Sequence, residues 1–232
     1  MTGRMIEFDS NGAPAPGYLV TPKSGSGPGV VVLHEWWGLT EPFREVCDKL
    51  AAAGFIALAP DLYRGKTADK AEEAEVLSAA LDQQVDQWRG DIAGAMRYLR
   101  QNGPSIPADG RGAFGIVAFS LGGAYALDMS VTAPDDIAAV ATFYATYPGL
   151  DYSRAKATYL FHFAEHDPYE SAEAATRMEQ ELKAAGKTVT VYTYPGTTHG
   201  FIGSNHPDTY DADATALAWE RTLAFLNAEL RR

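Results

Sequence analysis

Cysteine is almost absent from this chain of 232 residues. Cys47 is the only one, so no disulfide can form within the chain. It falls in the stretch 41–53, where Phe43, Val46 and Leu50 are spaced for one buried face of a helix. A thiol in such a helix is expected to be buried and structural rather than reactive.

Basic residues are also scarce. Lys and Arg number 19 against 30 Asp and Glu, which gives a net charge of −11. This acidity argues against a nucleic-acid partner and against binding to an anionic membrane surface. No apolar run approaches the ~18 residues of a membrane-spanning helix, and Met1–Arg4 lacks the apolar core of a signal peptide. We therefore expect a cytoplasmic protein without membrane or nucleic-acid partners, either a monomer or a small homo-oligomer.

The chain does contain a regular alternation of short apolar runs with longer helical patterns. Strands are predicted at Gly29–Leu33, Phe55–Ala59, Gly112–Phe119, Ile137–Tyr144, Thr158–Ala164 and Thr188–Tyr194, and helices at 41–53, 85–101, 170–185 and 211–229, with another from Leu121 onward. Neither a repeat nor a linker separates these elements. The pattern predicts one α/β domain over residues 1–232, with a mostly parallel sheet and helices on both faces.

Three further segments complete the predicted organisation. Met5–Phe8 and Tyr18–Thr21 can form a hairpin of edge strands around the turn Ser10-Asn11-Gly12. The stretch 66–84 is acidic and helix-prone, and is expected to lie partly over the site. The terminal helix is expected to turn four apolar residues inward: Leu217, Leu223, Phe225 and Leu226.

The stretch around Ser120 carries the first chemical signal. A buried strand ends at Phe119, a helix follows from Leu121, and small residues surround the serine in the pattern Ala-x-Ser-x-Gly-Gly. A strand that turns sharply into a helix needs small neighbours, because larger side chains would collide where the backbone doubles back. The pattern indicates a nucleophile elbow. The alternative is a serine that only caps a helix beside a glycine-rich turn.

Two more reactive side chains follow later strands. Asp167 comes after the strand predicted to end at Ala164, and His199 comes after the one predicted to end at Tyr194. Sites in open α/β sheets form beyond the carboxyl ends of strands, and the order Ser, Asp, His is that of α/β-hydrolase triads. Taken alone, Asp167 could instead cap the following helix and His199 could be an ordinary turn residue. Their joint occurrence favours a catalytic triad.

Each residue type suits a step of acyl transfer. A serine hydroxyl attacks a carbonyl only when a base accepts its proton, and imidazole titrates in the required range. A carboxylate orients the imidazole and stabilises the imidazolium. The oxyanion needs preorganised N–H donors, for which we expect Leu121, the residue after the nucleophile, and Trp36, in the loop after an earlier strand.

These motifs together resemble the dienelactone hydrolase family, from about residue 5 to the end of the chain. The segments that carry the resemblance are His34-Glu35-Trp36-Trp37-Gly38, Pro60-Asp61-Leu62-Tyr63, Phe119-Ser120-Leu121-Gly122-Gly123, His166-Asp167, His199-Gly200-Phe201 and Ala218-Trp219-Glu220-Arg221-Thr222. The resemblance implies a single-domain α/β-hydrolase fold that cleaves esters or lactones without a cofactor. It puts Ser120, Asp167 and His199 at the triad positions and Glu35 at that of a site glutamate beside the nucleophile.

The chain departs from the family pattern in two ways. The best-known members have a cysteine nucleophile where this chain has Ser120, which depends on His199 as its general base. Members specific for dienelactone hold the substrate carboxylate with arginines, and the one expected after the catalytic histidine is missing from Gly200-Phe201-Ile202-Gly203. This departure favours other small esters or lactones as substrates.

The remaining candidates concern the pocket and bound groups. Glu35, Trp37, Tyr144 and Phe201 are expected to line the substrate pocket, although aromatic residues more often belong to a plain core. The histidines lack metal-ligand spacing and no phosphate-cradling glycine pattern occurs, so neither a metal nor a cofactor is predicted. The sequence thus predicts a serine hydrolase of small esters or lactones. A non-catalytic binding protein on the same fold and a true dienelactone (carboxymethylenebutenolide) hydrolase are the alternatives.

Overall fold

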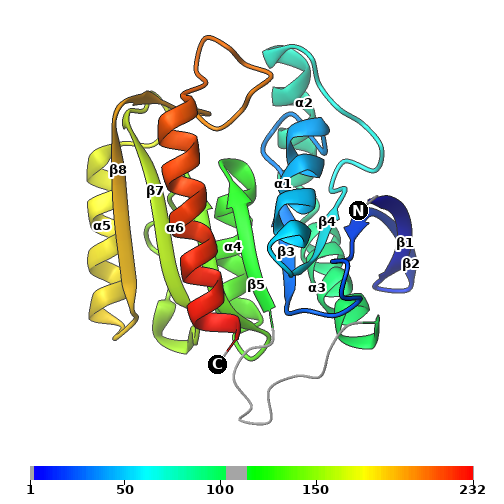
Figure 1. Cartoon of the computed structure of the whole chain (residues 1–232). Helices are drawn as coiled ribbons and strands as arrows, with labels where there is room; N and C mark the ends of the chain where they lie inside the picture. The colour runs from blue at the N-terminus through cyan, green and yellow to red at the C-terminus, as the bar shows by residue number, and fades with distance from the viewer. Residues whose placement is uncertain (1–2, 103–113, 232) are drawn as a thin grey trace.

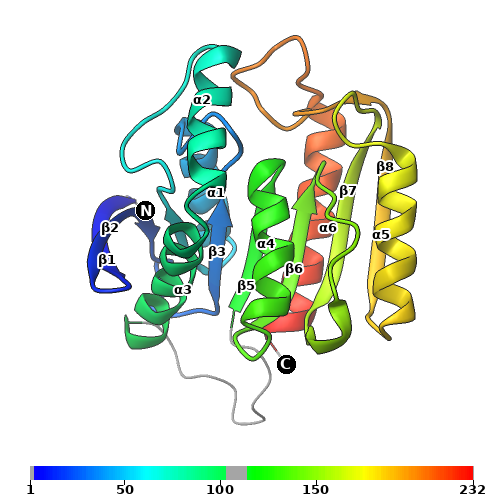
Figure 2. The same ribbon diagram turned by 180° about the vertical axis from the view of Figure 1, so that it is seen from behind.

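A computed structural model describes residues 3–102 and 114–231 of the chain. The first residues of the strand predicted at Gly112–Phe119 lie outside these ranges, and strand β5 is described from Phe114 to Phe119. Figure 1 shows a central sheet between helices, and Figure 2 shows the same arrangement from behind. The eight strands are ordered β1-β2-β4-β3-β5-β6-β7-β8.

The two amino-terminal strands form the predicted hairpin at one edge of the sheet. β1 (Arg4–Ser10) and β2 (Ala13–Val20) are antiparallel and joined by Asn11 and Gly12. Both turn residues have positive φ, 51° and 83°. Asn and Gly tolerate this conformation best, and it matches the twist of the strands that it joins. The hairpin predicted from Asn-Gly is therefore confirmed, with longer strands than expected.

The other six strands are parallel to one another, which confirms the mostly parallel sheet. They are β3 (Gly29–Leu33), β4 (Ile56–Pro60), β5, β6 (Ile137–Phe143), β7 (Thr158–His166) and β8 (Val189–Thr198). All five residues of β3 are buried, with Val30 and Val32 in one core cluster and Val31 and Leu33 in the other. A strand covered on both faces needs such a continuous apolar run.

Helices cover both faces of the sheet, as expected. On one face lie α1 (Glu41–Ala52) and α6 (Ala212–Leu230). On the other lie α2 (Ala71–Asp82), α3 (Val85–Asn102), α4 (Leu121–Thr132) and α5 (Ala172–Ala184). Cys47 on α1 is fully buried, and burial raises the pKa of its thiol, in agreement with a structural role.

Two strands run further than their sequence indicates. The sequence predicts that β7 ends at Ala164 and that β8 ends at Tyr194. Instead the ladder has an irregularity after Ala164 and resumes with His166 opposite Thr198. Gly196 supplies a positive φ of 74° within this stretch, which lets the strand continue.

One residue of the terminal helix was assigned to the wrong face. Leu226 is fully buried, but Leu217 is 41% exposed. Their separation of nine residues corresponds to about two and a half helical turns, so the two side chains point in opposite directions. The buried face of α6 follows Ala218, Thr222 and Leu226, each four residues apart.

Leu226 and Leu217 have opposite exposure on the same helix, so substituting each by alanine tests which face of α6 is buried. Leu226→Ala should lower the free energy of unfolding by about 2–5 kcal/mol, because it leaves a cavity in the core. Leu217→Ala, on the solvent side of the same helix, should change it by no more than about 0.5 kcal/mol. Urea unfolding followed by circular dichroism measures both values. Equal losses in the two variants would contradict the assigned helix face.

Candidate active site

Ser120 lies where β5 turns into α4, in a strained backbone conformation. Its φ is 48° and its ψ is −119°, outside the regions that non-glycine residues ordinarily occupy. A Cβ at Gly122 would lie 2.4 Å from the backbone oxygen of His34, and one at Gly123 would lie 2.3 Å from Cβ of Ala145. The turn can therefore form only with small residues at both positions. Although Ser120 occupies the N-cap position of α4, its side chain caps no backbone N–H there.

The structure brings the three predicted reactive side chains into one hydrogen-bonded chain. Oγ of Ser120 lies 2.9 Å from Nε2 of His199. Nδ1 of His199 lies 2.8 Å from Oδ2 and 3.0 Å from Oδ1 of Asp167. Each residue directly follows the end of its strand, β5, β7 or β8. A nucleophile, a base within hydrogen-bond reach and a group that orients the base are thus assembled at the carboxyl ends of the strands.

Asp167 is held by the backbone as well as by the histidine. Its Oδ1 accepts hydrogen bonds from the N–H groups of Tyr169 and Glu170, at 2.9 and 3.0 Å. Burial tends to raise the pKa of Asp167, but the contact with His199 and the two backbone bonds outweigh it, so this pKa lies below its usual value. Asp167 is therefore ionised around neutral pH. The N-cap of α5 is Ser171, so capping that helix does not explain Asp167.

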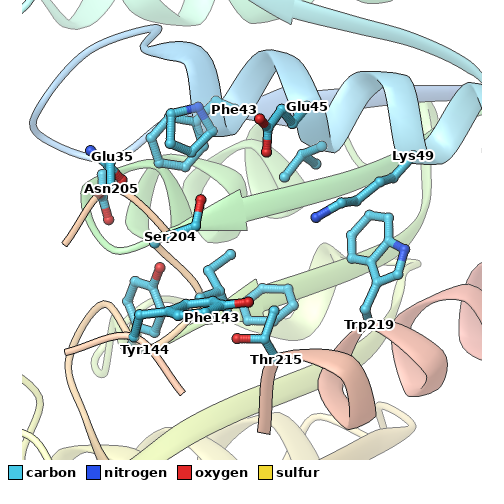
Figure 3. A pocket seen from close by; sticks show the side chains of 15 residues that line it. Glu35, Phe43, Glu45, Lys49, Phe143, Tyr144, Ser204, Asn205, Thr215 and Trp219 are labelled. Atoms are coloured by element: carbon cyan, nitrogen blue, oxygen red, sulfur yellow. The ribbon is translucent and has the colours of Figure 1, made fainter. Parts of the chain in front are cut away.

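Glu35 has a buried carboxyl group close to Ser120, His199 and Asp167. Its residue is 7% exposed, and burial raises its pKa from 4.5 to about 7, against the opposing effect of His199. It lies at one end of a pocket between α1 and α6, with Lys49 and Trp219 at the other end and Tyr144 along the side (Figure 3). A carboxyl with this pKa changes charge near neutrality, so the charge of the site depends on pH there.

This pocket is lined by two of the four residues predicted for the substrate pocket, and by none of Ser120, Asp167 and His199. Glu35 and Tyr144 line it, whereas Trp37 and Phe201 do not. Phe201 is fully buried, with its ring centre 5.7 Å from that of Tyr144. The Trp37 ring stacks on His206 at 5.2 Å. Phe201 therefore belongs to the core, and the place of Trp37 in the substrate pocket stays a prediction.

Tyr144 lies against the catalytic candidates. Its ring centre is 4.6 Å from that of His199, and the residue is 1% exposed. Its φ of 40° is a second strained conformation, directly after β6. Strain at two successive strand ends is typical of a site whose geometry is imposed by the surrounding fold.

The two expected oxyanion donors are on segments that touch each other. Leu121 is the first residue of α4, and Trp36 lies in the loop that follows β3. The contact of Gly122 with the backbone oxygens of Leu33 and His34 brings the elbow against the start of that loop.

Sequence reasoning missed Tyr169. Its ring centre lies 4.9 Å from that of His199 and 6.2 Å from that of Trp36, and the residue is 68% exposed. An exposed aromatic side chain beside a candidate triad suits contact with a substrate. The only signal was its place two residues after Asp167, at the carboxyl end of a strand.

The described residues contain neither a cluster of metal ligands nor a helix that could span a membrane. Within residues 3–102 and 114–231, no three side chains of His, Cys, Asp or Glu gather as they would around a metal ion. No helix in these ranges is long and apolar enough to cross a membrane.

Comparison with known proteins places this arrangement in a family context. Residues 15–230 match the dienelactone hydrolase family. The chain is 32% identical to Protein usf of Aquifex pyrophilus, over 98% of this chain and 99% of that protein. It is 28% identical to carboxymethylenebutenolidase 1 of Cupriavidus pinatubonensis, over 90% and 89%. A dienelactone hydrolase-like promiscuous phosphotriesterase from metagenomic libraries has a similar fold, with a TM-score of 0.84, 21% identity and 98% coverage of each chain.

The raised pKa of Glu35 predicts a pH-dependent stability. Because the folded state binds this proton more tightly than the unfolded state, stability falls as pH rises from about 4.5 through about 7. Glu35→Gln removes the ionisation, so the variant should be more stable than wild type at about pH 8, by a difference on the order of 3 kcal/mol. At about pH 5 the two proteins should differ little. Urea unfolding at both pH values tests this, and an equal difference at the two would contradict it.

Proposed function

Because the chain belongs to the dienelactone hydrolase family, we propose that it is a serine hydrolase that cleaves small carboxylic esters or lactones through an acyl-enzyme on Ser120. The observation that carries this proposal is the pair of contacts at His199, 2.9 Å to the hydroxyl of Ser120 and 2.8 Å to the carboxylate of Asp167. A serine becomes nucleophilic when such a base accepts its proton. An oriented carboxylate then stabilises the imidazolium.

The reaction proceeds in two halves. Nε2 of His199 takes the proton of Ser120 as Oγ attacks the carbonyl carbon, and the carbonyl oxygen becomes an oxyanion held by the backbone N–H groups of Leu121 and Trp36. The oxyanion collapses, the bond to the alkoxy oxygen breaks, and His199 protonates that oxygen. Water then attacks the acyl-enzyme with His199 again as base, and the carboxylic acid leaves while the proton returns to Ser120.

A serine nucleophile depends on its neighbours for activation in a different way from a cysteine. Its hydroxyl has no accessible ionised form of its own near neutral pH, so its activation rests on His199 throughout. Among the described residues, Glu35 has no hydrogen bond to Ser120, and in its ionised form it would oppose a developing oxyanion nearby. We therefore assign Glu35 to the pocket and His199 to proton transfer.

Two alternatives start from specific observations. A binding protein without chemistry could use the same pocket, because a fold does not fix a function. A true dienelactone hydrolase would agree with the name of the Cupriavidus relative, a carboxymethylenebutenolidase. The arginine expected shortly after the catalytic histidine, however, is missing from Gly200-Phe201-Ile202-Gly203. Simple esters and lactones without a carboxylate are therefore the favoured substrates.

Replacement of the nucleophile tests the proposal directly. We expect wild type to hydrolyse p-nitrophenyl esters from acetate to octanoate faster than dienelactone. Ser120→Ala should lower this turnover by a factor on the order of 10⁴ or more, because no other group can form the acyl-enzyme. The matched control is Ser130→Ala on the same helix, whose hydroxyl bonds Tyr159 away from the site and whose loss should leave turnover intact.

The same proteins separate the alternatives. Faster turnover of dienelactone than of any simple ester would support a dienelactone hydrolase. An active Ser120→Ala variant would disprove the acyl-enzyme. If no ester is hydrolysed and a fluorophosphonate fails to label Ser120, the binding-protein alternative is supported.

A second variant tests which group is the base. Since the pKa of Glu35 is raised to about 7, its titration overlaps the range expected of a histidine, and the pH profile of wild type alone cannot separate them. Glu35→Gln should lose less activity than the ~10²–10⁴-fold that removal of a general base costs, and should keep the acid limb of its pH–rate profile. His199→Ala should lose the full amount. A Glu35→Gln enzyme that lacks the acid limb would make Glu35 the base.

A further inference from the structure

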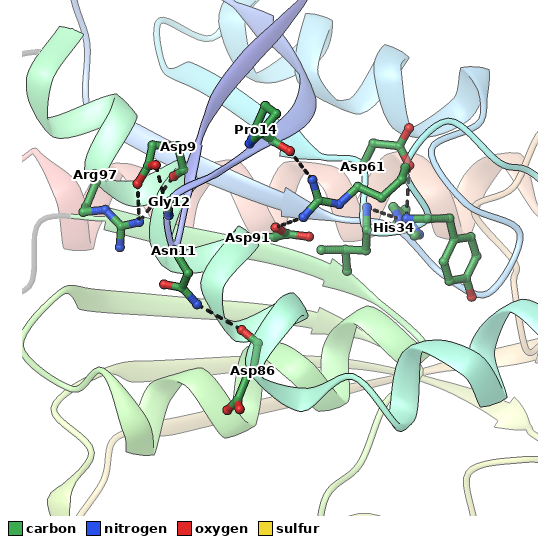
Figure 4. Close-up of polar contacts among 12 residues, drawn as sticks. Asp9, Asn11, Gly12, Pro14, His34, Asp61, Asp86, Asp91 and Arg97 are labelled. Atoms are coloured by element: carbon green, nitrogen blue, oxygen red, sulfur yellow. Dashed lines mark hydrogen bonds and ion pairs between the residues drawn. The ribbon is translucent and has the colours of Figure 1, made fainter.

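His34 is a buried histidine that the proposed mechanism does not use. It directly follows β3 and is 1% exposed. Its Nδ1 lies 2.7 Å from the backbone oxygen of Glu35. Its Nε2 lies 3.2 Å from the backbone nitrogen of Leu62, the contact that Figure 4 draws at His34. The imidazole therefore bridges the loops that follow β3 and β4.

The partners of the ring determine its tautomer. The N–H of Leu62 can only donate, so Nε2 must be the bare, accepting nitrogen. The proton is then on Nδ1, which donates to the oxygen of Glu35. Burial lowers the pKa of His34, so the ring stays neutral and this arrangement persists.

The oxygen that His34 holds belongs to the same peptide unit as the N–H of Trp36. That oxygen also accepts from the N–H of Gly38, at 3.1 Å, which closes the turn. A peptide unit is planar and trans, so its C=O and N–H point in opposite directions. Two donors that hold the oxygen of Glu35 therefore also hold the direction of the Trp36 N–H.

The ring is itself anchored by a rigid loop. Asp61, at 5% exposure, accepts the N–H groups of Tyr63 and Gly65, at 3.2 and 2.7 Å. Arg64 in the same loop pairs with the buried Asp91 of α3 at 2.7 Å. The loop that follows β4 is therefore fixed on α3, and His34 links this loop to the peptide unit between Glu35 and Trp36. On the opposite side the backbone oxygen of His34 packs against Gly122 in the elbow.

We propose that His34 is a positioning residue that aims the N–H of Trp36 at the oxyanion formed on the substrate of Ser120. This rests on the proposed function, because it requires an acyl-transfer reaction at Ser120. His34 touches neither the substrate nor Ser120. Its effect falls on the transition state, where the oxyanion exists, and leaves the binding of the uncharged ester unchanged.

Three variants test the inference. His34→Leu removes both hydrogen bonds and should lower kcat for p-nitrophenyl acetate by ~10²-fold, near the low end of the cost of one lost oxyanion donor. KM should stay within about threefold of wild type, since ground-state binding is untouched. His34→Asn keeps a donor near the oxygen of Glu35 and should recover most of the lost kcat.

The matched control is His162→Leu. His162 is the other fully buried histidine among the described residues, and it bonds Tyr194 and Thr222 at 2.7 and 2.9 Å. Its loss should destabilise the fold to a similar extent while sparing kcat. A trifluoromethyl ketone, which forms an oxyanion adduct with Ser120, should lose affinity for His34→Leu by the factor lost in kcat/KM, and keep its affinity for His162→Leu.

The outcomes separate the two proposals. If wild type is active and His34→Leu keeps its kcat, or loses no more than His162→Leu, the role of His34 is disproved and the serine mechanism stands. A loss that falls on KM alone, or a His34→Asn variant as impaired as His34→Leu, disproves it as well. If wild type hydrolyses no ester and fluorophosphonate does not label Ser120, both proposals fail. If His34→Leu does not fold, His34→Asn takes its place: a residual loss of kcat matched by an equal loss of ketone affinity supports the role of His34, and values equal to those of His162→Leu disprove it.

Discussion

The site depends on the close approach of α4 to the end of β3. At Gly122 the helix backbone lies so near the oxygens of Leu33 and His34 that a single methyl group would not fit. Because of this contact the chain can reverse direction at Ser120, although Ser120 has a positive φ. The same contact places the turn between β5 and α4 against the loop that contains Trp36. The strain at Ser120 is tolerated because parallel pairing of β3 with β5 and burial on both faces hold the two segments in place.

Three polar side chains buried at the carboxyl ends of the strands have definite partners. Asp167 accepts two backbone N–H groups besides the imidazole of His199, and Asp61 accepts two in its own loop. His34 uses both ring nitrogens. Such satisfied networks are rigid, because moving any member leaves a buried donor or acceptor without a partner. Glu35 is the contrast: burial raises its pKa to about 7, so its carboxyl changes charge near neutrality.

The positions of the reactive residues follow a common rule. His34, Ser120, Asp167 and His199 each occupy the first position after a strand. The strand ends were predicted well enough from apolar runs to select Ser120, Asp167 and His199, even where the boundary was wrong; His34 was not selected. β7 and β8 run past Ala164 and Tyr194, because a ladder between neighbouring strands can resume beyond an irregularity that neither sequence displays alone.

The sequence by itself determined the alternating elements, the Asn-Gly hairpin, the small residues of the elbow and the grouping of three reactive side chains at one sheet edge. These are local properties of period, turn chemistry and strand ends. Tertiary structure decided the rest: which face of α6 buries Leu226 and exposes Leu217, that Phe201 packs in the core, and that Tyr169 lies beside His199. It also decided that His34 joins two loops and that Glu35 titrates near neutrality, because both depend on desolvation and on partners far apart in the chain.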